Sequence, residues 1–88
     1  MKELIENGTV VDVRSPQEFK VEHFQSANNI PLEQVSQKVN DLKEMPNPII
    51  AYCFSSNRSG MAVSVLKQAG ITDAVNGGGL EYLLQQVK

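Results

Sequence analysis

The chain has 88 residues, of which 41% are hydrophobic, and this size supports one domain, residues 1–88, with an ordinary core. A formal net charge of -2 argues against nucleic acid as a partner, because nucleic-acid-binding proteins present a basic surface. The single cysteine and the single histidine exclude an internal disulfide and a zinc cluster.

The N-terminal residues contain no apolar run long enough for a signal peptide or a membrane span. We therefore expect a cytoplasmic protein that makes no contact with a membrane. A free thiol is also typical of a reducing compartment. A periplasmic location stays open if the chain is a mature or trimmed form. We expect the protein to be a monomer.

The first third of the chain begins with a strand signal. Residues 9–13 are rich in β-branched side chains, which predicts a short strand buried on both faces. Ser15, Pro16 and Glu18 then form a helix start: an N-cap, a proline at the first helical position and a capping box. This helix should end at residue 21 or 22. Residues 27–31 should form a short extended segment.

The remaining residues alternate between helix and strand signals. The apolar stretch at 49–52 is typical of a central parallel strand, and Gly70 is a plausible C-cap for the helix before it. Strands that alternate with helices predict an α/β fold with a mainly parallel central sheet flanked by helices. The expected elements are a helix over 32–42, a strand over 49–52, a helix from about Ser59 to Ala69, a strand at 74–75, a glycine turn at 77–79 and a closing helix over 80–87.

Cys53 lies at the C-terminal end of the predicted central strand, where α/β sheets gather their ligands. Residues 54–58 must turn the chain into the next helix, so several backbone N–H groups can converge at the helix N-terminus and hold an anion. These amides, the helix dipole and Arg58 would stabilise a thiolate over a thiol. The alternative is a cysteine that is merely packed in the core, as free cysteines often are.

Three blocks of the sequence resemble the rhodanese family, in the family's order and spacing. YCFSSNRSGMAVSVLKQAGI resembles its active-site strand, loop and helix. VVDVRSPQEFKVEHFQSANNIPL resembles its opening pattern, and VNGGGLEYL resembles its late glycine-rich turn. The blocks cover nearly the whole chain and are most similar to the small single-domain, phage-shock-protein-E-like type. The chain departs from the family at Ser56, Glu22 and Ser26, where glycine is common, and it lacks most of a first strand.

The resemblance implies a thiosulfate sulfurtransferase with a single rhodanese-like domain. Cys53 would take the outer sulfur of a small anionic donor such as thiosulfate, become a persulfide, and pass that sulfur to cyanide or to a thiol, including that of an acceptor protein. No metal or organic cofactor is implied. The substrate-binding loop would consist of Phe54, Ser55, Ser56, Asn57, Arg58 and Ser59. Since Ser56 replaces a common glycine, it would resist a positive φ angle in this loop.

Three further residues allow two interpretations each. Asp12 and Arg14 end the first strand and could line the same face of the sheet as Cys53. A structural pair is the favoured interpretation, because ionisable groups at strand ends are usually partnered, and Arg14 as a second substrate-steering cation is the alternative. His23 could serve as a general base, but a persulfide mechanism does not require one, so we interpret it as structural.

Two other functions are compatible with the same fold. A cysteine phosphatase or arsenate reductase also uses a thiolate followed by an arginine, but with a longer loop than the four residues that separate Cys53 from Arg58. A non-catalytic interaction module would need neither Cys53 nor Arg58. We therefore favour the sulfurtransferase and keep both alternatives, since a fold by itself does not establish a function.

Overall fold

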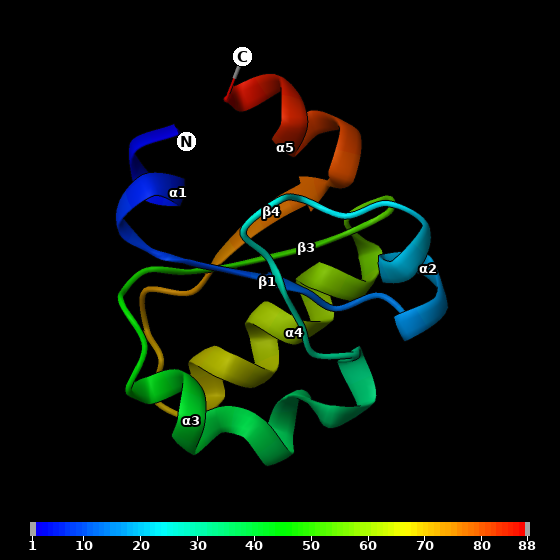
Figure 1. Ribbon diagram of the computed structural model, residues 1–88. Coiled ribbons are helices and arrows are strands. Elements are labelled where there is room, and N and C mark those ends of the chain that lie inside the picture. The colour runs from blue at the N-terminus through cyan, green and yellow to red at the C-terminus, as the bar shows by residue number, and fades with distance from the viewer. Residues whose placement is uncertain (1, 88) are drawn as a thin grey trace.

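The computed structural model describes residues 2–87 as one parallel four-stranded sheet with helices on both faces (Figure 1). The strand order is β2-β1-β3-β4, with every neighbouring pair parallel. The expected α/β fold is therefore confirmed. The elements are α1 (Lys2–Asn7), β1 (Thr9–Asp12), α2 (Pro16–Val21), β2 (Asn28–Asn29), the 3-10 helix η1 (Leu32–Lys38), α3 (Val39–Lys43), β3 (Ile49–Cys53), α4 (Asn57–Gln68), β4 (Val75–Gly79) and α5 (Leu80–Gln86).

Local signals placed several elements correctly. Ser15 caps α2 and forms the expected capping box with Glu18. Gly70 follows α4 with a φ of 102°, and the N–H of Ile71 donates to the carbonyl of Leu66 at 2.9 Å, which is the hydrogen bond of a glycine-capped helix end. Helix α4 begins at Asn57, two residues before the expected Ser59. Short-range capping chemistry was therefore readable from the sequence.

Three expectations on secondary structure were wrong or incomplete. The helix expected over 32–42 is divided into η1 and α3, and neither segment has a side-chain cap at its start. The glycines expected to form a turn at 77–79 belong to β4 instead. Helix α1 was not anticipated, and its only buried residue is Ile5. In each case packing against the sheet or against α4 decides the conformation, and local propensity does not.

Strand β3 divides the core into two layers, because successive side chains of a strand point to opposite faces. Ile49, Ala51 and Cys53 belong to the layer beneath α4, whereas Ile50 and Tyr52 pack toward α1 and α5. Figure 1 shows these two layers, with α1 and α5 on one side of the sheet and α3 and α4 on the other. The Cys53 sulfur is thereby directed to the side of the sheet that holds the start of α4.

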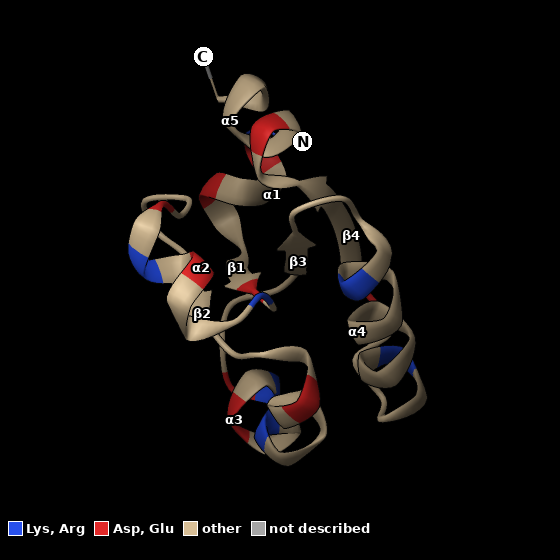
Figure 2. Ribbon diagram, turned by 90° about the vertical axis from the view of Figure 1, so that its right-hand side faces the viewer, with Lys and Arg blue, Asp and Glu red and all other residues tan. Residues whose placement is uncertain are grey.

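The longest helix within residues 2–87 is α4, with 12 residues. Within residues 2–87, no helix is both long and apolar enough to cross a bilayer. In the view of Figure 2, Lys and Arg are interspersed with Asp and Glu, most clearly around α3, and do not gather on one face.

Gly79 brings β4 and the loop after β3 into close contact. A Cβ atom at Gly79 would lie 2.4 Å from the carbonyl oxygen of Phe54, a distance that real Cβ atoms do not adopt. Both groups belong to the backbone, so no side-chain rotation can relieve the contact. Glycine at this position therefore fixes the start of the loop that follows Cys53.

We expect Gly79→Ala to destabilise the protein by about 1–3 kcal/mol, the usual cost of overpacking. Gly60→Ala is the matched control, because its Cβ would meet only the Asn76 side chain at an ordinary 3.5 Å and it lies inside α4. Alanine there should stabilise the protein by up to about 1 kcal/mol through higher helix propensity. Urea denaturation measures both changes, and equal midpoints for Gly79→Ala and the wild type would contradict the steric argument.

Candidate active site

Cys53 is a free, fully buried cysteine at the carboxyl end of β3. Its Sγ lies 3.3 Å from the Oγ of Ser59, in the first turn of α4. Backbone N–H groups of Ser55, Ser56 and Ser59 also interact with the sulfur. A strand end, a tight loop and a helix N-terminus therefore surround one sulfur atom with donors.

The hydrogen bonds around Cys53 favour its ionised form. Burial is the largest single influence on this thiol and opposes ionisation. The Ser59 hydroxyl and the three backbone amides act in the opposite direction and together outweigh it, so the pKa of Cys53 is lowered from its ordinary value. The sulfur is thus a better nucleophile at neutral pH than a buried thiol without these donors.

Ser59 connects the sulfur to Asn76, a residue that the sequence analysis did not single out. The Ser59 Oγ lies 2.7 Å from Asn76 Oδ1 and 3.1 Å from the carbonyl oxygen of Ser56. One hydroxyl has one proton, so Ser59 can donate to Asn76 while the thiol donates to Ser59, and must turn toward the sulfur when a thiolate forms. The N–H of Gly78 still donates to Asn76 Oδ1 at 2.9 Å in that case. The only sequence signal for Asn76 was its place beside the glycine run.

Ser56 adopts the left-handed conformation, with φ of 76° and ψ of -8°. This is the conformation that glycine adopts without cost and that a serine resists. The backbone turns here so that the amides of Ser55 and Ser56 face Cys53. The loop after Cys53 therefore carries a strained residue, as loops at functional sites often do.

Arg58 is engaged by Glu18 of α2. Its Nη1 and Nη2 donate to Glu18 Oε1 and Oε2 at 2.8 and 3.0 Å, and both side chains are more than a third exposed. These hydrogen bonds lower the pKa of Glu18 to about 2, and the pKa of Arg58 is raised. An ionised Cys53 also raises the pKa of Arg58, so the guanidinium lies within electrostatic reach of the sulfur.

The other loop residues and Arg14 have different surroundings. Phe54 is 71% exposed, and the side chain of Asn57, the first residue of α4, is also exposed. Arg14 is buried and bonds to the fully buried Asp12 through its Nε and Nη2 at 2.8–3.1 Å. Asp12 also accepts a hydrogen bond of 2.7 Å from the hydroxyl of Tyr52. Arg14 thus belongs to a structural network beside the site.

The contacts described for His23 are with Phe19, four residues earlier in the chain. Its ring stacks on Phe19 with centroids 3.8 Å apart, and its Nδ1 lies 2.9 Å from the Phe19 carbonyl oxygen. Both contacts stabilise the turn after α2.

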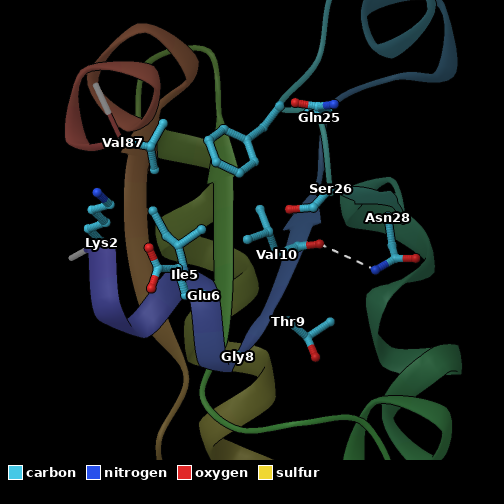
Figure 3. Close-up of a pocket in the computed structure, with 11 residues that line it drawn as sticks. Lys2, Ile5, Glu6, Gly8, Thr9, Val10, Gln25, Ser26, Asn28 and Val87 are labelled. Atoms are coloured by element: carbon cyan, nitrogen blue, oxygen red, sulfur yellow. Dashed lines mark hydrogen bonds between the residues drawn. The ribbon is translucent and has the colours of Figure 1, made fainter.

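A hollow of about 640 Å3 lies between α1, β1 and the segment before β2, and Cys53 is not among its lining residues (Figure 3). Its lining includes Lys2, Ile5 and Glu6 of α1, Val10 of β1 and Val87. The loop after β3 supplies none of its lining residues. This hollow and Cys53 are therefore in different parts of the molecule, and we identify the candidate site by its chemistry.

The chain matches the rhodanese-like domain family over residues 1–83. It is 40% identical over 67 residues to YqhL, an uncharacterised protein of Bacillus subtilis, and the match covers 76% of this chain but only 52% of YqhL, so the chain spans about half of that relative's length. It is 35% identical over 72 residues to the thiosulfate sulfurtransferase PspE of Escherichia coli, covering 81% of this chain and 69% of PspE.

A solved structure gives the same result for the fold. The chain is similar to a rhodanese with anions from E. coli, with a TM-score of 0.77, 33% identity, and coverage of 84% of this chain and 88% of that one. The sulfur in its cradle of amides, the family match and this structural likeness agree, and this chain belongs to the rhodanese-like domain family.

Proposed function

We propose that this protein is a sulfurtransferase that moves a sulfane sulfur from an anionic donor such as thiosulfate to cyanide or a thiol through a persulfide on Cys53. The observation that carries the proposal is the set of donors around the sulfur: the Ser59 hydroxyl and the amides of Ser55, Ser56 and Ser59. The relative PspE, named a thiosulfate sulfurtransferase and 35% identical to this chain, supports the same activity.

The first half-reaction loads the sulfur onto Cys53. The Cys53 thiolate attacks the outer sulfur of thiosulfate, the sulfur–sulfur bond of the donor breaks, and sulfite leaves with the bonding electron pair. The product persulfide is an anion like the thiolate, so the same amides and hydroxyl stabilise the reactant and the loaded intermediate. Since Cys53 has no exposed surface, side chains of the loop must move aside for the donor to reach it.

The second half-reaction unloads the sulfur. Cyanide or a thiolate attacks the outer sulfur of the persulfide, the sulfur–sulfur bond breaks, and Cys53 leaves as a thiolate. This leaving group is a good one, because its pKa is lowered. No net oxidation or reduction is needed over the two steps. A phosphatase and a non-catalytic module stay as the alternatives that experiments must distinguish from this proposal.

Thiosulfate should add the mass of one sulfur atom to the protein, and cyanide should then remove it as thiocyanate. Intact-mass spectrometry before and after each addition measures both steps. Cys53→Ser should show neither change. An unmodified wild type that hydrolyses an aryl phosphate would replace this proposal with the phosphatase alternative.

The thiolate of Cys53 should form at a pH below the ordinary thiol pKa of about 8.5, as its lowered pKa requires. Thiolate absorbance in the ultraviolet measures the titration, and Cys53→Ser provides the blank. Ser59→Ala should move the midpoint upward, because it removes the hydroxyl donor and keeps the backbone amides. A wild-type midpoint at or above the ordinary value would mean that the loop amides do not face the sulfur in solution.

Arg58 is expected to bind the anionic donor, for which it must partly leave Glu18. Arg58→Lys keeps the charge but loses the planar guanidinium, which can donate two parallel hydrogen bonds. The loss of transition-state stabilisation should be on the order of 1–3 kcal/mol, so kcat/KM for thiosulfate should fall by about 5- to 150-fold. Arg58→Ala should lower it at least as much.

Glu18→Gln is the complementary variant, because it frees the guanidinium from a partly exposed ion pair worth up to about 1 kcal/mol. It should raise kcat/KM for thiosulfate by up to about fivefold.

Full turnover by Arg58→Ala would contradict a role of Arg58 in binding the donor. It would show that Arg58 only joins α4 to α2 through Glu18.

A further inference from the structure

A groove of about 290 Å3 lies beside the loop that follows Cys53. We call it the acidic groove, and its lining residues are Glu22, Phe54, Leu80, Glu81 and Leu84. They come from three parts of the chain: the end of α2, the loop after β3, and α5. The groove therefore exists only because the fold brings these parts to the carboxyl edge of the sheet.

The apolar surface of the acidic groove has no use in binding a small anion. Phe54 directly follows the nucleophile and is 71% exposed, and Val21, which precedes Glu22, is 88% exposed. Thiosulfate and cyanide are small, charged and strongly hydrated, so they gain nothing from an aromatic ring. Large exposed apolar side chains next to a reactive group indicate contact with a macromolecule.

The charges of the acidic groove select the kind of macromolecule. Glu22 and Glu81 are both exposed and line the groove together with the apolar side chains. Two carboxylates at the edge of an apolar surface favour a partner with basic side chains and disfavour an acidic one. The complementary surface is therefore a segment that combines an apolar residue with lysine or arginine.

Both walls of the acidic groove are held in place by the fold. Arg14 Nη2 donates to the carbonyl oxygen of Glu22 at 2.6 Å, and Arg14 is itself bound to the buried Asp12. On the other side, the close approach of Gly79 to the Phe54 carbonyl positions Phe54 beside the first turn of α5. A preformed groove binds a segment with less ordering of its own residues than a mobile one would need.

We infer that the acidic groove docks the cysteine-bearing segment of an acceptor protein, with an apolar side chain on Phe54 and a basic side chain between Glu22 and Glu81. This inference rests on the proposed function, since the groove is lined by Phe54, the residue that directly follows Cys53 in the chain. The acceptor thiolate attacks the outer sulfur, the sulfur–sulfur bond breaks, Cys53 leaves as a thiolate, and the acceptor carries away a persulfide. Cyanide would react without using the groove.

Binding tests the groove without relying on catalysis. The probes are two fluorescent ten-residue peptides with a serine in place of the acceptor cysteine and one leucine beside it, flanked by lysine and arginine in one and by glutamate in the other. Fluorescence anisotropy should show the basic peptide binding at least about tenfold more tightly. Glu81→Lys should abolish this preference, and high salt should weaken it by screening. Glu33→Lys is the control, because it makes the same charge change at an exposed residue of η1 outside the groove.

Sulfur transfer to the cysteine forms of the two peptides gives a second readout. The basic peptide should accept sulfur from loaded Cys53 at least about tenfold faster, and Glu81→Lys should reduce that rate without changing transfer to cyanide. Equal binding of both peptides, or the same loss in Glu33→Lys, would overturn the inference while normal transfer to cyanide kept the proposed function intact. A clear binding preference in a protein that thiosulfate does not load would overturn the proposed function and support the groove.

Discussion

The buried carboxylate of Asp12 holds the carboxyl edge of the sheet together. An ion without exposed surface must have its hydrogen bonds satisfied, because an unpartnered buried charge costs several kcal/mol. Arg14 and Tyr52 supply those bonds, and each has a second partner: Arg14 bonds to the Glu22 carbonyl, and the Tyr52 hydroxyl accepts from the N–H of Phe24. The ends of β1 and β3 and the segment after α2 are therefore fixed relative to one another. Burial also raises the pKa of Tyr52, so its hydroxyl stays protonated as the donor to Asp12.

The position of the Cys53 sulfur follows from this network through the alternation of side chains along β3. Tyr52 points to Asp12 on one face, so Cys53, the next residue, must point to the other face, toward Ser59 and the start of α4. The chain then has only a few residues in which to reverse into α4, and Ser56 takes a left-handed conformation to do so. Amides that a looser loop would expose to water are turned onto the sulfur instead. Because successive side chains of β3 alternate, the buried ion Asp12 and the buried thiol of Cys53 lie on opposite faces of the sheet.

The loop after Cys53 has a polar ion pair on one side and an apolar, acidic groove on the other. Arg58 and Glu18 form a polar, partly exposed ion pair on one side of the loop, suited to exchange with a small anion. Phe54 and the acidic groove present apolar surface and carboxylates on the other, suited to a basic segment of a protein. A sulfurtransferase must meet a donor and an acceptor in succession at one sulfur atom. Distinct recognition surfaces for the two would allow one nucleophile to serve both without a cofactor.

The sequence by itself determined the features whose signals lie within a few neighbouring residues. The capping box of Ser15 and Glu18, the apolar strand that ends at Cys53 and the glycine cap after α4 were all readable locally, because each depends on its own backbone or on the next turn. The left-handed conformation of Ser56 was anticipated only through the resemblance to a family in which glycine is common at this position. Only the tertiary structure decided the pairing of Arg58 with Glu18, which are 40 residues apart, and the bond of Ser59 to Asn76. It also decided that Gly79 lies within a strand, since the need for glycine there comes from the Phe54 backbone in the loop that follows β3. Such contacts depend on strand order and register, which no short stretch of sequence contains.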